Sequence, residues 1–259
     1  MNALKAWLSG LIAGKDPGPA APRLHAAQRP PLLYAIGDVH GCLTELKALE
    51  ARIVADAASE PGEKWLVMLG DYVDRGPHSA QVIDHLLAPP PKGFKRICLR
   101  GNHEAAMLGA LDGAGLETWL GWGVESTLAS YGLGAAQIAL LSGPGRLSAK
   151  QQTLAAYIPD EHATFLRELP TMLTVPGYIF VHAGLRPGVP LAAQRDNDLL
   201  WIRGDFLDTD HDFGAVIVHG HTPADEPFLS AYRIGLDTGC FASGRLTGLR
   251  VDGDGAWVV

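Results

Sequence analysis

The chain has 259 residues, of which 47% are hydrophobic and 19% charged, a balance that excludes extensive disorder and predicts a globular fold. Its net charge of −7 argues against a nucleic-acid partner, because affinity for a phosphate backbone needs a basic surface. Cys42, Cys98 and Cys240 form no C-x-x-C pair, which favours reduced thiols in a cytoplasmic protein. No apolar run reaches the roughly 20 residues of a membrane helix, so we expect no membrane span.

The N-terminal segment is expected to lie outside the folded domain. Its first residues, MNALKAWLSGLIAG, carry one Lys, a short apolar stretch and no clear small-residue cleavage site, which favours an amphipathic helix over a signal peptide. Residues 15–31 are rich in Pro and Ala and read as a linker or an extended arm. We therefore predict a helix and arm over residues 1–31 and a single domain over residues 32–259.

From Leu32 the chain alternates between short apolar runs and segments with helical spacing. The runs predict strands at 32–38, 65–71 and 95–102, and the segments between them predict helices at 42–58 and 79–88. Such alternation is typical of a parallel sheet in an α/β fold.

The second half begins with a different pattern. Residues of about 105–170 predict a mostly helical insertion, in which we place substrate specificity. Strands are expected again at 178–184, 215–221 and 234–239, and the end of the chain predicts a hairpin closed by residues 252–255.

Metal-ligating and charged residue types follow the predicted strands, usually after a Gly. Loops at the carboxyl ends of strands form the active sites of open α/β sheets, so we expect these side chains to converge. The candidates are Asp38, His40, Asp71, Asp74, Arg75, Asn102, His103, His182, His219 and His221.

This set suits a pair of metal ions. Asp38 and His40 are two residues apart in an extended chain and point to the same side, so both can bind one cation. The two oxygens of Asp71 can bridge to a second cation about 3.5–4 Å away. Asn102, His182 and His221 offer further ligands. Nitrogen and oxygen ligands without Cys favour Mn, then Fe, Zn, Co or Ni, over Mg or Ca.

Several blocks resemble a known family. GDVHG (37–41), GDYVDRG (70–76) and GNHE (101–104) resemble the three signature blocks of the phosphoprotein phosphatases within the calcineurin-like metallophosphoesterases. VHAG (181–184) and VHGHTP (218–223) look like the two later histidine blocks. LLWIR (199–203) and DTGCFASGRL (237–246) resemble the bacterial and phage-type serine/threonine phosphatase branch. The resemblance implies a central β-sandwich flanked by helices on both sides.

The resemblance also implies a role for each residue. Asp38, His40 and Asp71 would hold the first metal, and Asp71, Asn102, His182 and His221 the second. His103, oriented by Asp74, would be the general acid. Arg75 and Arg203 would hold phosphate oxygens, next to Asn102. A second His after Gly220-His221, present in many members of the wider superfamily, is replaced by Thr222-Pro223, as in the protein-phosphatase branch.

Other residues near these blocks are expected to have structural roles. We predict core packing for Trp119 and Trp122, with the lining of a substrate groove as the alternative. For Asp237 a turn-capping role is favoured over that of a further ligand, and His219 is expected to be structural, since His221 better matches the motif.

The mechanism that fits this set is attack on phosphorus by a hydroxide bridging two metal ions, with His103 and Asp74 as the acid pair. The leading hypothesis is a protein serine/threonine phosphatase acting on phosphoproteins. The alternative is a hydrolase of diadenosine tetraphosphate or related nucleotides. Asp74 in GDYVDRG favours the former, because the related symmetrical dinucleotide hydrolases tend to lack that Asp. A third hypothesis, an inactive metal-binding scaffold, is disfavoured because the ligands and the acid are all present.

Overall fold

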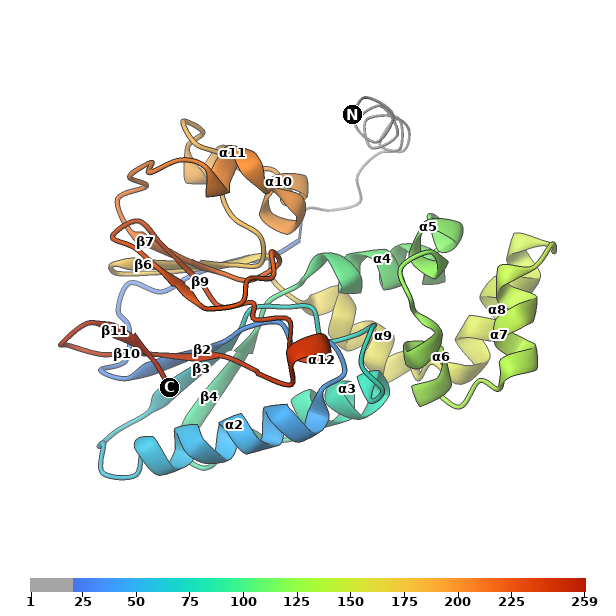
Figure 1. Ribbon diagram of the computed structural model, residues 1–259, viewed down its shortest axis with the longest axis horizontal. Helices are drawn as coiled ribbons and strands as arrows, with labels where there is room; N and C mark the ends of the chain where they lie inside the picture. Colours follow the sequence, from blue (N-terminus) through green and yellow to red (C-terminus); the bar gives the residue numbers. More distant parts are fainter. Residues whose placement is uncertain (1–20) are drawn as a thin grey trace.

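Two β-sheets lie face to face between layers of helices in the computed structural model, which describes residues 21–259 (Figure 1). This arrangement confirms the predicted α/β sandwich flanked by helices on both sides. The predicted N-terminal helix lies outside the described residues. None of the helices within residues 21–259 is long and apolar enough to cross a membrane.

The first sheet has five strands in the order β11-β10-β2-β3-β4. The strands β2, β3 and β4 are parallel, as the alternating pattern predicts, and β10 joins the edge of β2 in the antiparallel sense. The predicted C-terminal hairpin is β10–β11, closed where the N–H of Asp252 donates to the carbonyl of Gly255. The bounds are Leu33–Ile36 for β2, Lys64–Met68 for β3, Phe94–Cys98 for β4, Gly248–Val251 for β10 and Ala256–Val258 for β11.

The second sheet has six strands in the order β1-β5-β6-β7-β9-β8. Its centre, β6-β7-β9, is parallel, and it contains the three strands expected after the helical insertion. The bounds are Arg23–His25 for β1, Met172–Val175 for β5, Tyr178–Val181 for β6, Val216–His219 for β7, Phe228–Leu229 for β8 and Arg233–Gly235 for β9.

Part of the N-terminal arm belongs to this sheet. The strand β1 pairs in parallel with β5, with Leu24 opposite Leu173. Arg23 also bonds the Asp196 carboxylate and the carbonyl of Gln194. The prediction that the folded domain starts at Leu32 therefore misses the edge strand β1. A strand of three residues in a Pro-rich segment is too short to show a periodic pattern in the sequence.

Side chains alternate between two apolar layers along each strand. In β2, Leu33 and Ala35 point into the space between the sheets, while Tyr34 and Ile36 point outward to the helices. Because both faces of these central strands are covered, one by the other sheet and one by helices, almost all of their side chains are apolar.

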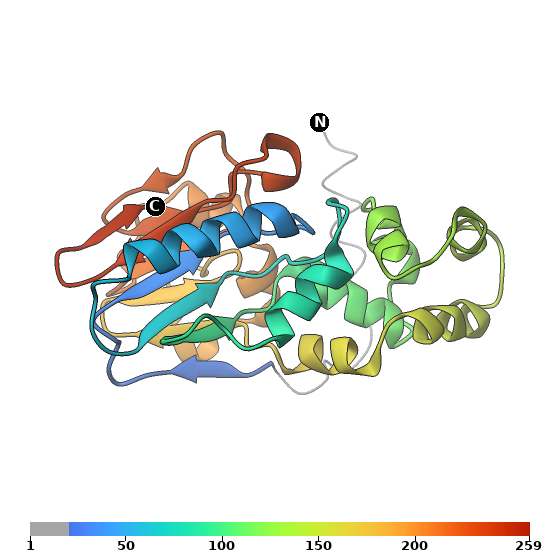
Figure 2. The ribbon, with the colours of Figure 1, turned by 90° about the horizontal axis from the view of Figure 1, so that it is seen from below.

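Helices cover both outer faces of the sandwich (Figures 1 and 2). The first sheet is covered by α2 (Leu43–Asp56) and α3 (Ser79–Leu87). The second is covered by α10 (Asp196–Trp201) and α11 (Gly204–Leu207), after a short 3₁₀ turn, η1 (Leu191–Ala193). The one-turn helix α12 (Cys240–Ser243) follows β9.

The segment between β4 and β5 is helical, as predicted, and extends to one side of the sandwich (Figure 1). It contains α4 (Asn102–Leu111), α5 (Leu116–Leu120), α6 (Glu125–Ser130), α7 (Ala135–Ser142), α8 (Leu147–Tyr157) and α9 (Asp160–Glu168). The apolar core continues from α2 and α3 into this segment through Trp119, Leu128 and Leu154, so the insertion and the sandwich share one core.

Packing of α2 provides a stability test. Leu46 is fully buried against the first sheet, whereas Val54 on the same helix is 40% exposed. Leu46→Ala is expected to lower the free energy of unfolding by about 2–5 kcal/mol, because it leaves a cavity. Val54→Ala should change it by about 0.5 kcal/mol or less. Urea unfolding of both variants measures the difference; similar values would contradict the packing described for α2.

Candidate active site

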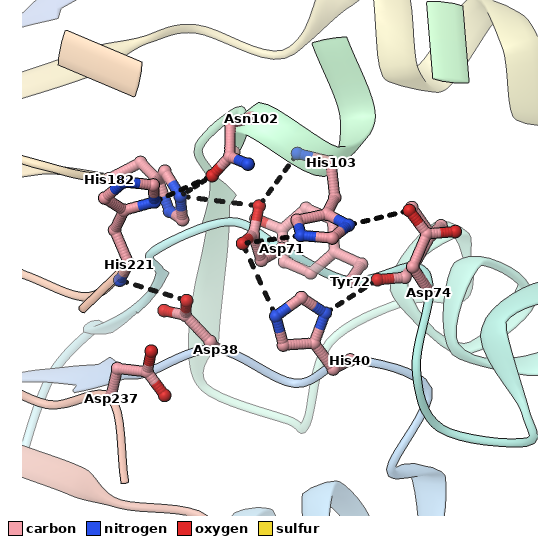
Figure 3. Close-up of polar contacts among 12 residues, drawn as sticks. Asp38, His40, Asp71, Tyr72, Asp74, Asn102, His103, His182, His221 and Asp237 are labelled. Atoms are coloured by element: carbon pink, nitrogen blue, oxygen red, sulfur yellow. Dashed lines mark hydrogen bonds and ion pairs between the residues drawn. The ribbon is translucent and has the colours of Figure 1, made fainter. Parts of the chain in front are cut away.

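The predicted site residues meet at the carboxyl ends of the strands, around Asp71 (Figure 3). Asp38 and His40 follow β2; Asp71, Asp74 and Arg75 follow β3; Asn102 and His103 begin α4 after β4; His182 follows β6; and His221 follows β7. Both sheets therefore contribute to one cluster, which lies where the sandwich meets the helical insertion.

The Asp71 carboxylate lies between three imidazoles. Its Oδ2 is 3.5 Å from His40 Nε2 and 3.9 Å from His103 Nε2, and its Oδ1 is 3.4 Å from His182 Nε2. Each oxygen therefore faces a different group of ligand-type atoms. One group is His40, Asp71 and His103, and the other is Asp71, His182 and His221. Asp71 belongs to both, which is the placement required of a bridging carboxylate.

The remaining polar atoms fit a cation. The carbonyl of Leu69 can only accept, so His182 donates to it through Nδ1 at 3.0 Å. Burial lowers the pKa of His182 to about 4, so the ring is neutral and Nε2 has no proton. That nitrogen nevertheless faces two acceptors, Asn102 Oδ1 at 2.8 Å and the Asp71 carboxylate. A metal ion would satisfy all three atoms, since each has a free lone pair.

His40 repeats this arrangement. Its Nδ1 donates to the carbonyl of Val73 at 2.8 Å, its Nε2 faces Asp71, and burial lowers its pKa well below the usual range. A backbone acceptor on one ring nitrogen commonly orients a metal-binding histidine. The Nε2 atom of His221 is buried without a partner among the described residues.

Asp38 lies beside these two groups. Its Oδ2 accepts the N–H of His221 at 3.0 Å, and its Oδ1 is buried without a described partner. Burial, together with the charges of Asp237 and Asp71, raises the pKa of Asp38 well above its usual value. A bound cation would offset the neighbouring negative charges and so favour the ionised form of Asp38.

His103 and Asp74 form a buried pair. His103 Nδ1 lies 2.7 Å from Asp74 Oδ2. Burial lowers the pKa of His103, but the Asp71 charge and the bond to Asp74 outweigh it, so the pKa is raised overall. The Nε2 atom is then available to donate a proton.

The helical insertion holds Asp74 in place, a contribution that the sequence did not indicate. Trp119 Nε1 donates to Asp74 Oδ2 at 3.0 Å, and Thr127 Oγ1 donates to Oδ1 at 2.8 Å while accepting the Asp74 N–H. The predicted core packing of Trp119 is confirmed, because the ring is fully buried. Trp122 also packs against the main core, as predicted, but it is half-buried, and its ring lies 5.2 Å from that of His103.

Glu104 is a residue that the sequence analysis missed. Its buried carboxylate accepts the N–H groups of Asp71, Tyr72, Val73 and Gly101 at 2.7–3.3 Å. Burial and the Asp71 charge raise the pKa of Glu104 to about 7, against the effect of those donors. A Glu in the third position of a helix that follows a Gly is the available signal, because that position reaches back to the helix start.

The backbone at the site is held in an uncommon conformation. His40, Asp71, Asp74, Arg75 and His221 all have positive φ, between 43° and 71°. Such conformations cost free energy for residues with a Cβ and cluster at functional sites. The glycines nearby have a steric role, since a Cβ on Gly101 would collide with Asp71 and a Cβ on Gly220 would collide with Asp38.

The predicted phosphate-binding arginines are exposed. Neither Arg75 nor Arg203 makes a side-chain hydrogen bond or an ion pair within residues 21–259. The Arg75 guanidinium lies 4.6 Å from the Phe241 ring centroid, and the Arg203 charge contributes to the lowered pKa of His221 after burial and His182. Both are therefore free to bind an anion near the cluster.

The other two residues agree with their expected structural roles. Asp237 Oδ1 accepts the N–H of Gly239 at 2.9 Å, which caps the turn after β9. His219 lies outside both groups of ligand-type atoms, and its ring packs 5.1 Å from that of Phe206.

The sandwich and the Asp71-centred cluster define a metal-dependent hydrolase, and comparison with known proteins identifies its family. Residues 32–242 match the calcineurin-like phosphoesterase family, so the chain belongs to it. This confirms the resemblance found in the signature blocks.

Individual relatives resemble nearly the whole domain. Bis(5′-nucleosyl)-tetraphosphatase PrpE (asymmetrical) of Bacillus cereus is 26% identical over 235 residues, or 83% of this chain and 88% of the relative. A crystal structure of a candidate diadenosine tetraphosphatase superposes with a TM-score of 0.63 at 22% identity, covering 92% of this chain and 97% of the other. A serine/threonine phosphatase of Saccharomyces cerevisiae superposes with a TM-score of 0.53 at 15% identity, covering 93% and 83%. At these identities, the two structures show a shared fold.

The contact between Thr127 and Asp74 provides a test of the role of the insertion. Thr127→Val keeps the shape of the side chain but removes one hydrogen-bond donor from the Asp74 carboxylate. We therefore expect the free energy of unfolding to fall by about 1–3 kcal/mol. The turnover of an ester with a poor leaving group should fall as well, because His103 is oriented less firmly. Thr153→Val, whose hydroxyl is exposed and bonds only within α8, is the matched control. Equal effects of the two changes in urea unfolding and in turnover would show that the contact is unimportant.

Proposed function

We propose that this protein hydrolyses dinucleoside polyphosphates, cleaving a P–O–P bond to release a nucleoside monophosphate. The supporting observation is the similarity to the Bacillus tetraphosphatases over 83% of this chain. The family match over residues 32–242 includes every residue of the Asp71 cluster. Asp74 led the sequence analysis to rank protein phosphatase activity first. The comparisons favour the alternative, and the Asp74–His103 bond is compatible with either substrate, because it orients the acid without contacting the leaving group.

The metal ligands in this proposal are those inferred from the sequence. Asp38, His40 and Asp71 would hold one ion, and Asp71, Asn102, His182 and His221 the other. Mn²⁺ suits these nitrogen and oxygen ligands, with Fe, Zn, Co and Ni as alternatives. Bound ions would supply Lewis acidity and a water of lowered pKa.

The protein's own side chains perform the remaining tasks. Arg75 and Arg203 bind phosphate oxygens, which a planar guanidinium can contact in pairs. His103 protonates the leaving oxygen from Nε2 while Asp74 holds Nδ1. A nucleoside polyphosphate leaves with a pKa near that of a phosphate, so this substrate depends less on the acid than a serine ester does.

A substrate panel distinguishes the candidate activities. With added Mn²⁺, we expect diadenosine tetraphosphate to give AMP and ATP, and we expect a chelator to abolish the reaction. Chromatography of the products measures the reaction, and kcat/KM is compared with that for phosphoserine peptides. Two molecules of ADP would indicate symmetrical cleavage. A value of kcat/KM more than about tenfold higher for the peptides, or about 1.4 kcal/mol of transition-state preference, would contradict the proposal.

The second candidate remains protein serine/threonine phosphatase activity. It is favoured by the burial of the His103–Asp74 pair, since a serine alkoxide needs a proton more than a phosphate does. If His103 is the acid, His103→Asn should slow phosphoserine hydrolysis by about 10²–10⁴-fold.

The same variant should lose less activity with p-nitrophenyl phosphate or diadenosine tetraphosphate, whose leaving groups are more stable as anions. The measurement is kcat against leaving-group pKa for both proteins. Parallel plots would mean that His103 positions the substrate instead of protonating the leaving group.

A further inference from the structure

Two tryptophans from different elements meet beside the Asp71 cluster. Trp122 follows α5 in the helical insertion, and Trp201 is the last residue of α10 on the opposite sheet. Their ring centroids are 5.3 Å apart and their planes are inclined by 70°. Trp122 lies 5.2 Å from His103, and Trp201 lies 6.1 Å from His221. The two indoles therefore border the cluster on the side of the acid and of the second group of ligand-type atoms.

Core packing accounts for only part of this pair: Trp122 is half-buried and packs against the main core, whereas Trp201 belongs to none of the apolar clusters of the described chain. Trp119, three residues before Trp122, is fully buried and uses its indole N–H to bind Asp74. Trp201 is 38% exposed, and neither Trp122 nor Trp201 donates its indole N–H to another residue of the described chain. An exposed aromatic face next to buried catalytic residues is typical of a surface that binds a ligand.

The charge around the pair fits a ligand with both an anionic and an aromatic part. Arg203 lies two residues after Trp201, is exposed, and makes no side-chain ion pair within residues 21–259. A phosphate between Arg203 and the cluster would therefore have an aromatic surface beside it. The side chain of a phosphoserine carries no ring, whereas a nucleotide carries a base on the same ribose as its phosphate.

A further aromatic ring lies on the other side of the cluster. Phe241 is 37% exposed, and its ring lies 5.5 Å from that of His40 and 4.6 Å from the Arg75 guanidinium. Exposed aromatic rings therefore lie at the His40 side, where Phe241 contacts Arg75, and at the His221 side, where Trp201 lies. A substrate with phosphates in the middle and a base at each end matches this arrangement.

We propose that Trp122 and Trp201 form a stacking subsite for a nucleobase of the substrate, with the phosphates reaching Arg203 and the Asp71 cluster. This deepens the proposed function and rests on it for the identity of the natural substrate. Indole faces do not read the hydrogen-bonding edge of a base, so the subsite accepts any base and prefers purines for their larger stacking area. It would explain how this site selects nucleotides without a base-specific contact.

The test compares two ligands that differ only in the base. AMP and ribose 5-phosphate are titrated by calorimetry into the Mn²⁺-loaded protein, without any need for turnover. Wild type should bind AMP about 5- to 150-fold more tightly than ribose 5-phosphate, a ratio of affinities that corresponds to about 1–3 kcal/mol of stacking. In Trp201→Ala this ratio should fall towards one, and in Trp201→Phe it should largely recover.

Trp257→Ala is the matched control, because Trp257 is 39% exposed but lies on β11, away from the cluster. It should keep the wild-type ratio. The inference is overturned if Trp201→Ala retains the preference for AMP, or if it weakens both ligands equally, since a structural role would not distinguish them.

Dinucleotide turnover is measured separately. If the wild type prefers AMP through Trp201 but does not hydrolyse diadenosine tetraphosphate, the subsite stands and the proposed function fails. If it hydrolyses the dinucleotide but binds AMP and ribose 5-phosphate alike, the proposed function stands and the subsite fails.

Discussion

The carboxylate of Glu104 is the contact on which the geometry of the site depends. It accepts the N–H groups of three consecutive residues after β3 and that of Gly101 at the start of α4. These hydrogen bonds satisfy buried backbone donors, and together they offset the cost of the positive φ at Asp71. The loop after β3 and the first turn of α4 are thereby held together, which brings the Asp71 carboxylate to the N–H and the ring of His103.

Burial of several carboxylates at one place is the main electrostatic cost of this structure. Asp38, Asp71, Glu104 and Asp237 are all buried, and burial raises the pKa of each. Isolated buried charges are strongly unfavourable unless they are paired or bind metal. Burial lowers the pKa of His40 and of His182, so these two rings are neutral and cannot balance the charge themselves. Added cations would offset this charge, and the cluster has the groups of ligand-type atoms that could hold them.

The helical insertion has two separate functions in this architecture. Through Trp119 and Thr127 it fixes Asp74, and through Trp122 it borders the cluster opposite Trp201 of α10. The orientation of the acid and the shape of the substrate surface therefore arise in the same segment. If His103 is the acid and Trp122 borders the substrate, as proposed, a shift of α5 or α6 would change both proton transfer and substrate preference.

The sequence by itself determined the α/β class, the strands that carry the site and the residues that follow them. It could do so because buried parallel strands are read from short apolar runs, and because Asp, His and Asn after Gly stand out at their ends. It ranked the substrate classes on Asp74 alone, and that ranking is not supported by the comparisons.

Tertiary structure decided the contacts that join distant segments. The arm residues 23–25 became a strand because β5 offered an unpaired edge, which no local pattern records. Glu104, Thr127 and Trp119 acquired their roles from partners up to 53 positions away, and Trp122 and Trp201 met across 79 positions of chain. Such pairings depend on how the sheets and the insertion pack, which the whole chain determines. Periodicity and residue type, in contrast, are properties of local segments and can be read directly from the sequence.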